Sequence, residues 1–511
     1  MHRPRSWLAL LAFAPMLAGC ASSSLDMAPD RADRPWTPDT TTNGEINPGT
    51  HAPEHSPNTA YVLPSNPTLG AIPAPPSGLV PGHVYSLAEL IDIAQSNNPV
   101  TRIAWDEARD AALAAGIARS AFLPNLSAGV IGGYQTGPNR ASLLGASSNG
   151  SVRADGTISA VSLQWLLFDF GERSAIVDAA LQGSVVTNIA FTAAHQQVIY
   201  KVSLAFYAHA AAQARVETAA RALKNALDIQ VAAEARFGQG EGTVVDVAEA
   251  RQATAQAKFA QVQADGAAQN AYISLLAAMG ISPLTKIQIA DTADRKLSPA
   301  MTGSIEEVVS AALARRPDTL TAYAAHEASL DNLRAAQAEF MPKLFVAATG
   351  SYATGSLYVT GIPGIAQQPP TLNLSPQGLG ATVLVGISIP LYDGGVRDAN
   401  VERARTDVEK SEARLQEISD DAIQQVVAAG NTLRTSLAAY AAAQTLTAAA
   451  HTTFDGTLQA YRHGVGSITA ATAAETRLLG AEDAETDAYN SALSAAATLA
   501  LTVGTLGAAP Q

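Results

Sequence analysis

The sequence predicts a mainly α-helical chain with a β-barrel part, built from one unit that occurs twice. Three observations lead to this fold class. Alanine is abundant while only 5% of residues are aromatic and 15% charged, which suits long, closely packed helices. Matching motifs recur at an offset of 218 to 226 residues, which indicates an internal duplication. Within each copy, two segments alternate apolar with small or polar residues, as strands do.

Residues 1–19 have the features of a secretory signal peptide. Arg3 and Arg5 give a basic start, and an apolar run from Trp7 to Leu17 follows. This run is too short to span a bilayer, which takes about 20 apolar residues in a helix.

The signal ends in Leu17-Ala18-Gly19-Cys20, which resembles the bacterial lipobox. The resemblance implies cleavage before Cys20 and acylation of that residue, and several acyl chains anchor a protein firmly. Cys20 is the only cysteine, so no intramolecular disulfide is possible. An Asp at the next position would resemble an inner-membrane retention signal, so Ala21 favours the outer membrane. The alternative is an ordinary cleavage site with an incidental cysteine.

Residues 20–82 follow as a lipidated cysteine and a proline-rich tether. Twelve prolines and few large apolar residues predict an extended segment that buries little surface. A net charge of −13 argues against nucleic acid as a partner. No run after residue 19 reads as a transmembrane helix, so any membrane span is expected to consist of strands.

The body divides into a first unit at 83–281 and a second at 304–505, with a linker at 282–303 and a tail at 506–511. A helix in each unit ends at a Phe-x-Pro motif, because proline cannot continue it. Two strands follow, each about as long as the 9–11 residues that cross a membrane. The predicted ranges are 100–121 and 318–340 for the helices, 126–136, 157–168, 344–354 and 379–391 for the strands, and 137–156 and 355–378 for external loops.

A very long helix comes next in each unit, and a glycine-containing turn reverses the chain into a further helix. Apolar residues at spacings of 3, 4 and 7 predict coiled-coil packing, and each long helix would extend roughly 100 Å. The expected ranges are 172–236 and 396–462 for the long helices, and 243–279 and 468–503 for the helices that follow them.

Four strands per chain cannot close a barrel, and open edges are not tolerated in lipid. If the strands lie in a membrane, several copies of the chain must therefore close the sheet together. Soluble hairpins are the alternative, because strand periodicity alone does not distinguish the two.

Over 84–505 the sequence resembles the TolC-type outer-membrane efflux family, in its lipoprotein branch. The resemblance rests on Arg316-Pro317-Asp318, Phe340-x-Pro342, the segment Pro390–Gly395 and the duplicated Arg-x-x-x-Gly turns. It implies a homotrimer whose 12-stranded β-barrel lies in the outer membrane, on an α-helical periplasmic tunnel. Such a trimer would be a passive exit channel for an inner-membrane pump and a periplasmic adaptor (membrane fusion) protein. A type I protein secretion channel and a coiled-coil structural or adhesive lipoprotein are the alternatives.

The resemblance also implies roles for residues at the turns between the long helices. Adaptor contacts are expected at Arg236, Gly240, Arg462, Val465, Gly466 and Ser467, and a pore gate at Asp246 and Glu475. Thr472 stands where the duplication predicts a second Asp, and Ile468 where some members have an arginine, so the salt bridge of those members is absent. Plain turn glycines and a solvated helix face are the alternatives.

Two aspartates, Asp169 and Asp393, lie between a strand and a helix and are expected to cap the helix N-terminus. Aromatic residues at 134, 165, 352 and 358 are expected either in an interfacial belt or in a core. No catalytic motif is found, and the nine histidines lack the spacing of metal ligands. The sequence therefore predicts no enzyme, no cofactor and no metal.

Overall fold

The computed structural model describes residues 28, 32, 36, 38–51, 62–72, 74–76, 78–143, 146–291, 304–355, 361–362, 371–372 and 378–507. The predicted signal peptide and Cys20 lie outside these residues. The chain divides into two compact units, Met1–Gly78 and Leu79–Gln511.

The first unit has local structure that differs from the extended tether predicted for it. Strands β1 (Pro38–Thr40) and β2 (Ile46–His51) pair antiparallel, and a short 3₁₀ helix, η2, covers Pro67–Gly70. The turn closes through a hydrogen bond from Thr41 N to Glu45 O of 2.8 Å. Gly44 adopts a φ of +82° in this turn, a conformation that glycine tolerates without steric strain.

In the second unit, each repeat opens with two consecutive helices. These are α3 (Leu87–Asn97) and α4 (Pro99–Ser120), then α7 (Ile305–Arg315) and α8 (Pro317–Ala338). A capping box begins the first helix of each pair, formed by Ser86 with Glu89 and by Ser304 with Glu307. A proline at the first turn then starts the second helix.

The bounds of the long helices lie within two residues of those that their uninterrupted patterns predict. They are α5 (Glu172–Gly238) and α9 (Val396–Arg462), each of 67 residues, and they reverse into α6 (Val244–Ala278) and α10 (Ile468–Thr502). We call α5–α6 and α9–α10 the two hairpins. One stretch of α5 is long and apolar enough to cross a membrane, contrary to the prediction that none would be. Because α5 packs against α4, α6, α8 and α10, we interpret it as part of the helical body.

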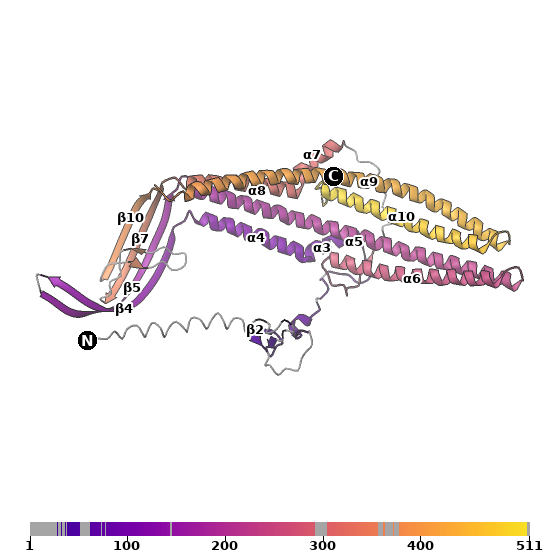
Figure 1. Cartoon of the computed structure of the whole chain (residues 1–511), viewed down its shortest axis with the longest axis horizontal. Coiled ribbons are helices and arrows are strands. Elements are labelled where there is room, and N and C mark those ends of the chain that lie inside the picture. Colours follow the sequence, from indigo (N-terminus) through magenta and orange to yellow (C-terminus); the bar gives the residue numbers. More distant parts are fainter. Residues whose placement is uncertain are drawn as a thin grey trace. The chain divides into compact units, whose positions relative to one another are not determined.

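Four long strands form one antiparallel sheet in the order β10-β7-β5-β4. Figure 1 shows this sheet at one end of the second unit and the turns of the two hairpins at the other. The strands are β4 (Asn125–Leu143), β5 (Ala146–Phe168), β7 (Lys343–Gly355) and β10 (Gly378–Ser388). The sheet thus joins strands from both repeats and ends in two unpaired edges, β4 and β10.

The prediction of a loop at 137–156 is wrong. Strands β4 and β5 instead continue their pairing without a break from Asn125↔Gln164 to Leu143↔Ala146. Strand pairing satisfies backbone groups whatever the side chains are, so a stretch of small polar residues can extend a hairpin. Two short strands, β8 (Gly361–Ile362) and β9 (Thr371–Leu372), pair within the other predicted loop.

Two hydrophobic clusters hold the hairpins together at different positions along the helices. The first joins α3, α5, α6 and α10 around the fully buried Leu90, Val202, Leu275, Leu276 and Met279. The two-residue strands β3 (Val84–Tyr85) and β6 (Gln288–Ile289) pair in parallel beside it. The second cluster lies near the hairpin turns and joins α5, α6, α9 and α10.

Candidate functional site

A buried ion pair fixes the junction between the sheet and the long helix in the first repeat. Arg173 Nε donates to Asp169 Oδ2 at 2.7 Å, and the two side chains are only 8% and 6% exposed. Arg173 also donates to the carbonyl oxygens of Ala121, at 2.9 Å, and Leu166, at 2.6 Å. One guanidinium therefore connects the end of α4, the end of β5 and the start of α5.

The second repeat has the same pair in a more open setting. Arg397 Nε lies 3.0 Å from Asp393 Oδ2, with 15% and 31% of the side chains exposed. The arginines lie over the rings of Phe122 and Phe340, the aromatic residues of the two Phe-x-Pro motifs.

Both aspartates accept backbone hydrogen bonds from the first turn of the helix, as predicted, at 3.0 Å from Arg173 N and 3.1 Å from Arg397 N. The prediction missed the arginine. A signal for it was present, because Asp-x-Gly-x-Arg occurs at 169–173 and again at 393–397.

The aromatic residues predicted near the strands are largely exposed in the single chain. Trp165 is 40% exposed, Tyr134 58% and Tyr352 54%, while Tyr358 lies outside the described residues. Trp165 Nε1 donates to Phe122 O at 2.8 Å, so its ring is held at the strand end next to the Asp169–Arg173 junction.

The two arginines of the duplicated Arg-x-x-x-Gly turns have different surroundings. Arg236 Nη1 donates to Tyr461 O at 2.7 Å, and its guanidinium lies 5.1 Å from the centre of the Tyr461 ring. Arg236 therefore ties the end of α5 to the end of α9. Among the described residues, the ion-pair partner of Arg462 is Asp228 at a long 3.8 Å, and both of these side chains are well exposed.

The predicted adaptor-contacting turn of the second hairpin points into solvent. Val465 is 85% exposed, and Ser467 caps α10 through Ala470 N at 3.2 Å. In the first hairpin, Gly240 has a φ of +79°, which lets the chain reverse without strain. Phe237 beside it is 49% exposed.

The second hydrophobic cluster explains why Ile468 departs from the charged pattern of the resemblance. Ile468 is 4% exposed and packs with Tyr461, Leu458 and Ala471 beneath the turns. A charged side chain at this position would lie in an apolar cluster, which is costly without a partner. Apolar packing therefore joins the hairpins at Ile468.

The two predicted gate carboxylates occupy different environments. Asp246 forms a capping box with Thr243 at the start of α6, accepting from Thr243 N at 2.9 Å. Glu475 is half-buried on α10, where burial and then the charge of Glu482 raise its pKa to about 7. The structure thus couples Glu475 electrostatically to Glu482, two turns along the same helix.

A third carboxylate near the turns was not predicted. Glu249 on α6 accepts hydrogen bonds of 3.4 Å from Thr469 and from Thr472, both on α10. Thr472, which replaces the expected second Asp, is therefore part of a contact between the hairpins. The sequence did not predict this contact, because Thr469 and Thr472 lie more than 200 residues from Glu249 along the chain.

The duplicated unit, with its shared four-stranded sheet and long paired helices, is matched by one protein family. The sequence profile of the family "Outer membrane efflux protein" matches residues 90–281 and 308–505. The chain belongs to this family, whose members are channels and not enzymes. A coiled-coil structural or adhesive lipoprotein is thereby excluded as a class.

Individual proteins agree with this assignment. The chain is 28% identical to protein CyaE of Bordetella pertussis over 339 residues, 65% of each chain. It is 25% identical to the outer membrane protein OprJ of Pseudomonas aeruginosa over 353 residues, which cover 68% of this chain and 70% of OprJ. The alignments thus span about two thirds of these relatives.

The fold is that of a solved outer-membrane channel. The crystal structure of CusC, described as forming a transmembrane channel, superposes with a TM-score of 0.69 at 19% identity. The superposition covers 82% of this chain and 92% of CusC. The superposition shows a shared fold, and the family assignment rests on the profile match over both repeats.

Proposed function

We propose that three copies of the chain form an exit channel of a tripartite efflux system in the outer membrane. The observation that supports this proposal most strongly is the pair of open sheet edges. Strands β4 and β10 are unpaired at the two sides of the sheet, and a four-stranded sheet cannot close on itself in lipid. Three copies would supply twelve strands, enough for a barrel around a channel.

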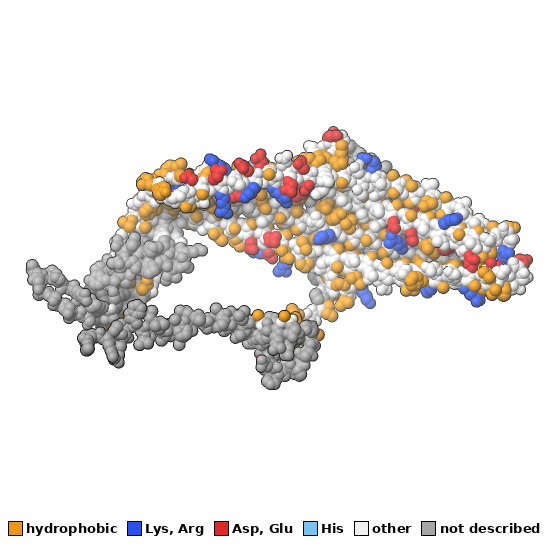
Figure 2. All heavy atoms as spheres, in the orientation of Figure 1, with side chains coloured by type: hydrophobic (Ala, Val, Ile, Leu, Met, Phe, Trp, Pro, Cys, Tyr) orange, Lys and Arg blue, Asp and Glu red, His pale blue; other side chains and the backbone are white. Residues whose placement is uncertain are grey.

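Exposed apolar side chains support assembly of several copies. On β10, Val383, Val385 and Ile387 are 66–70% exposed and alternate along the strand, as lipid-facing residues do. On the helical body, Ile103, Leu113 and Ile117 of α4 are 58–72% exposed. Figure 2 shows hydrophobic side chains distributed over the long helices, with charged side chains gathered mainly along the sheet-proximal half of α8 and α9. In a trimer, the helical residues would contact neighbouring copies, and the two hairpins of each copy would form the wall of a periplasmic tunnel.

The hairpin turns are the proposed docking surface for a periplasmic adaptor. The exposed side chain of Val465 and the turn residues Gly240, Gly466 and Ser467 would make this contact, with Arg462 beside them. Arg236 has a structural role in this surface, because its hydrogen bond to Tyr461 O holds the two turns together.

Cross-linking can test both the docking surface and the type of pump. Cys20 is the only natural cysteine, so a Val465→Cys variant would carry one free thiol when Cys20 is acylated. We expect a thiol-reactive photo-cross-linker at this position to capture an adaptor in cells, together with a proton-driven pump in the purified complex. A cysteine at exposed Thr406 of α9, about 84 Å along the helix from Arg462, is the matched control. Capture of an ATP-driven transporter instead would favour type I secretion, and capture of neither would reject the docking surface.

Cys20 is the proposed lipid anchor, which fixes the chain to the inner leaflet of the outer membrane. We expect Cys20→Ala to abolish incorporation of an alkyne-labelled palmitate, because this residue supplies the only thiol. A Ser22→Ala variant should keep full labelling. Labelling that persists in Cys20→Ala would show acylation at another residue and remove the anchor from Cys20.

The entrance of the channel is proposed to lie near the turns, with Asp246 and Glu475 facing the pore. Three copies would place a ring of Glu475 carboxylates there. A ring of negative charge favours cations over anions. The half-buried position of Glu475 and the nearby charge of Glu482 make this ring sensitive to pH around neutrality.

A further inference from the structure

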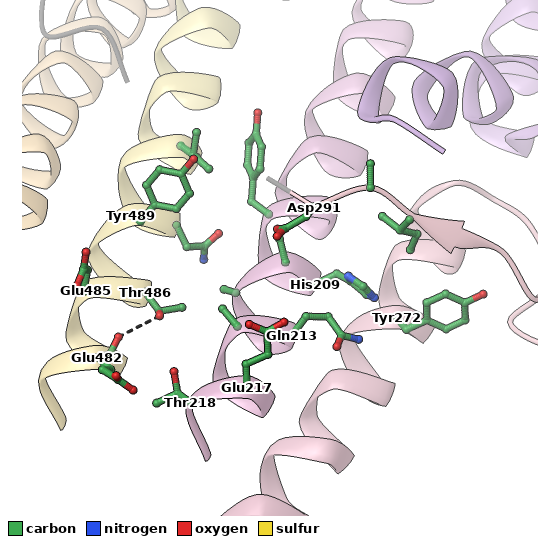
Figure 3. A pocket seen from close by; sticks show the side chains of 18 of the residues that line it. His209, Gln213, Glu217, Thr218, Tyr272, Asp291, Glu482, Glu485, Thr486 and Tyr489 are labelled. Carbon is green, nitrogen blue, oxygen red and sulfur yellow. Dashed lines mark hydrogen bonds between the residues drawn. The ribbon is translucent and has the colours of Figure 1, made fainter. Parts of the chain in front are cut away.

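A cavity of about 820 Å³ lies between the two hairpins, and no role described above uses it. Its walls come from α5, α6, α9, α10 and the segment after β6, and Figure 3 shows Thr486 and Tyr489 on one side with Gln213, Glu217 and Asp291 across from them. Along α5 and α10, the cavity falls between the first and second hydrophobic clusters. Its volume is in the range of ligand pockets, about 300–1,000 Å³.

The lining has an excess of negative charge. Four carboxylates line the cavity, those of Glu217, Asp291, Glu482 and Glu485. Arg221 is bound to Glu482 at 3.0 Å, and His451 lies 3.2 Å from the other oxygen of the same carboxylate. Burial lowers the pKa of His209, so this ring is uncharged at neutral pH. Neither Glu217 nor Glu485 forms an ion pair with another described residue.

Aromatic rings supply the apolar part of the lining. Tyr440 and Tyr489 are in contact, with ring centres 5.2 Å apart, and Tyr207 and Tyr272 also line the cavity. The hydroxyl of Tyr272 is held by Ile287 N at 2.8 Å, which fixes that ring against the wall. Tyrosine faces attract cations and pack against flat apolar groups.

One buried acceptor among the lining residues has no donor. The amide oxygen Oδ1 of Asn490 is inaccessible to solvent and has no hydrogen-bond partner among the described residues. A buried polar atom without a partner is unfavourable, so a rotation of the partly exposed Asn490 side chain that brings Oδ1 to a ligand N–H donor is favoured.

We propose that this cavity binds an organic cation with an aromatic body and a protonated amine that carries N–H donors. Carboxylates select the positive charge, tyrosines accept the aromatic body, and Asn490 Oδ1 accepts an N–H bond. The site follows from the lining of one chain and does not depend on which pump the channel serves.

Three indole compounds separate these contributions. Tryptamine carries a protonated primary amine, N,N,N-trimethyltryptammonium carries a charge without ammonium N–H donors, and indole-3-acetate carries the opposite charge. With the full-length protein in lipid nanodiscs, we expect calorimetry to show one tryptamine site per chain. The trimethyl compound should bind about tenfold more weakly, and indole-3-acetate should show no saturable binding.

Variants test whether the binding occurs in this cavity. Glu485→Gln and Asn490→Ala should each weaken tryptamine binding about tenfold, and only Asn490→Ala should remove the preference for tryptamine over its trimethyl analogue. Glu409→Gln is the matched control, because Glu409 is an exposed carboxylate of α9 about 45 Å along the helix from Tyr440. Unchanged affinity in both cavity variants, or equal binding of indole-3-acetate, would overturn the proposal. Conductance measurements play no part in this test, so its result is independent of the proposed channel function.

Discussion

Asp169→Asn is expected to lower the free energy of unfolding by about 3 kcal/mol, because it leaves the buried Arg173 charged without its carboxylate. Both side chains are less than a tenth exposed, so water cannot replace the lost partner. The same arginine bonds to Ala121 O and Leu166 O, so three elements loosen together. The midpoint of urea unfolding, followed by circular dichroism, measures the loss.

The second repeat provides the matched control for this prediction. Asp393→Asn removes the equivalent carboxylate where 31% of the Asp393 side chain is exposed, so this pair is less buried than the first. We expect a clearly smaller loss of stability. Equal losses at the two positions would show that burial of the pair does not determine its contribution.

The loss of stability caused by Asp169→Asn should also depend on pH. Burial alone would raise the pKa of Asp169, but the hydrogen bonds and charge of Arg173 outweigh it and hold the pKa below its usual value. A depressed carboxyl pKa stabilises the fold at pH values above the unfolded pKa of about 4, and this contribution is lost as pH falls through the folded value. The difference in free energy of unfolding between the wild type and Asp169→Asn should therefore become smaller below about pH 4.

Glu475→Gln is expected to remove a pH-dependent rise in cation preference. The carboxyl has a pKa of about 7, raised by burial and by Glu482, so it is neutral in mild acid and ionised in mild base. In the wild-type channel, cation preference should rise as pH increases from 6 to 8. A unit charge close to the conducting path in water contributes about 1 kcal/mol, or roughly fivefold in preference.

Reversal potentials in a salt gradient measure this preference. Glu417→Gln, which neutralises an exposed carboxylate paired with Arg414 on α9, is the control and should keep the pH-dependent rise. A rise that survives in Glu475→Gln would place the titrating group elsewhere and remove Glu475 from the gate.

Most of the helical architecture could be predicted because strong local signals mark where helices begin and end. The bounds of α9 are those predicted, and those of α10 differ at one end by one residue, since glycine-containing turns flank both. The β4–β5 hairpin is longer than predicted because its outer part holds small polar residues without alternation. Pairing there depends on the partner strand, which local sequence does not reveal.

The candidate site was less predictable than the fold, because its contacts join residues far apart in the chain. The carboxylate of Asp169 was recognised as a helix cap from its local position. Arg236 was recognised from the duplicated turn, but its bond to Tyr461 O crosses 225 residues. Likewise, Glu482 and Arg221 meet across 261 residues, and neither lies in a motif. Tertiary packing alone brings such groups together.

Reconstitution of the purified wild-type protein in planar bilayers, with the mass of the inserted species measured, tests the central claim most directly. The account predicts stable conductance steps from a species of three chains, because one sheet of four strands has two open edges. Conductance that appears only at trimer mass would support a barrel shared among copies. A monomer that inserts and conducts, or a trimer that never conducts, would contradict it.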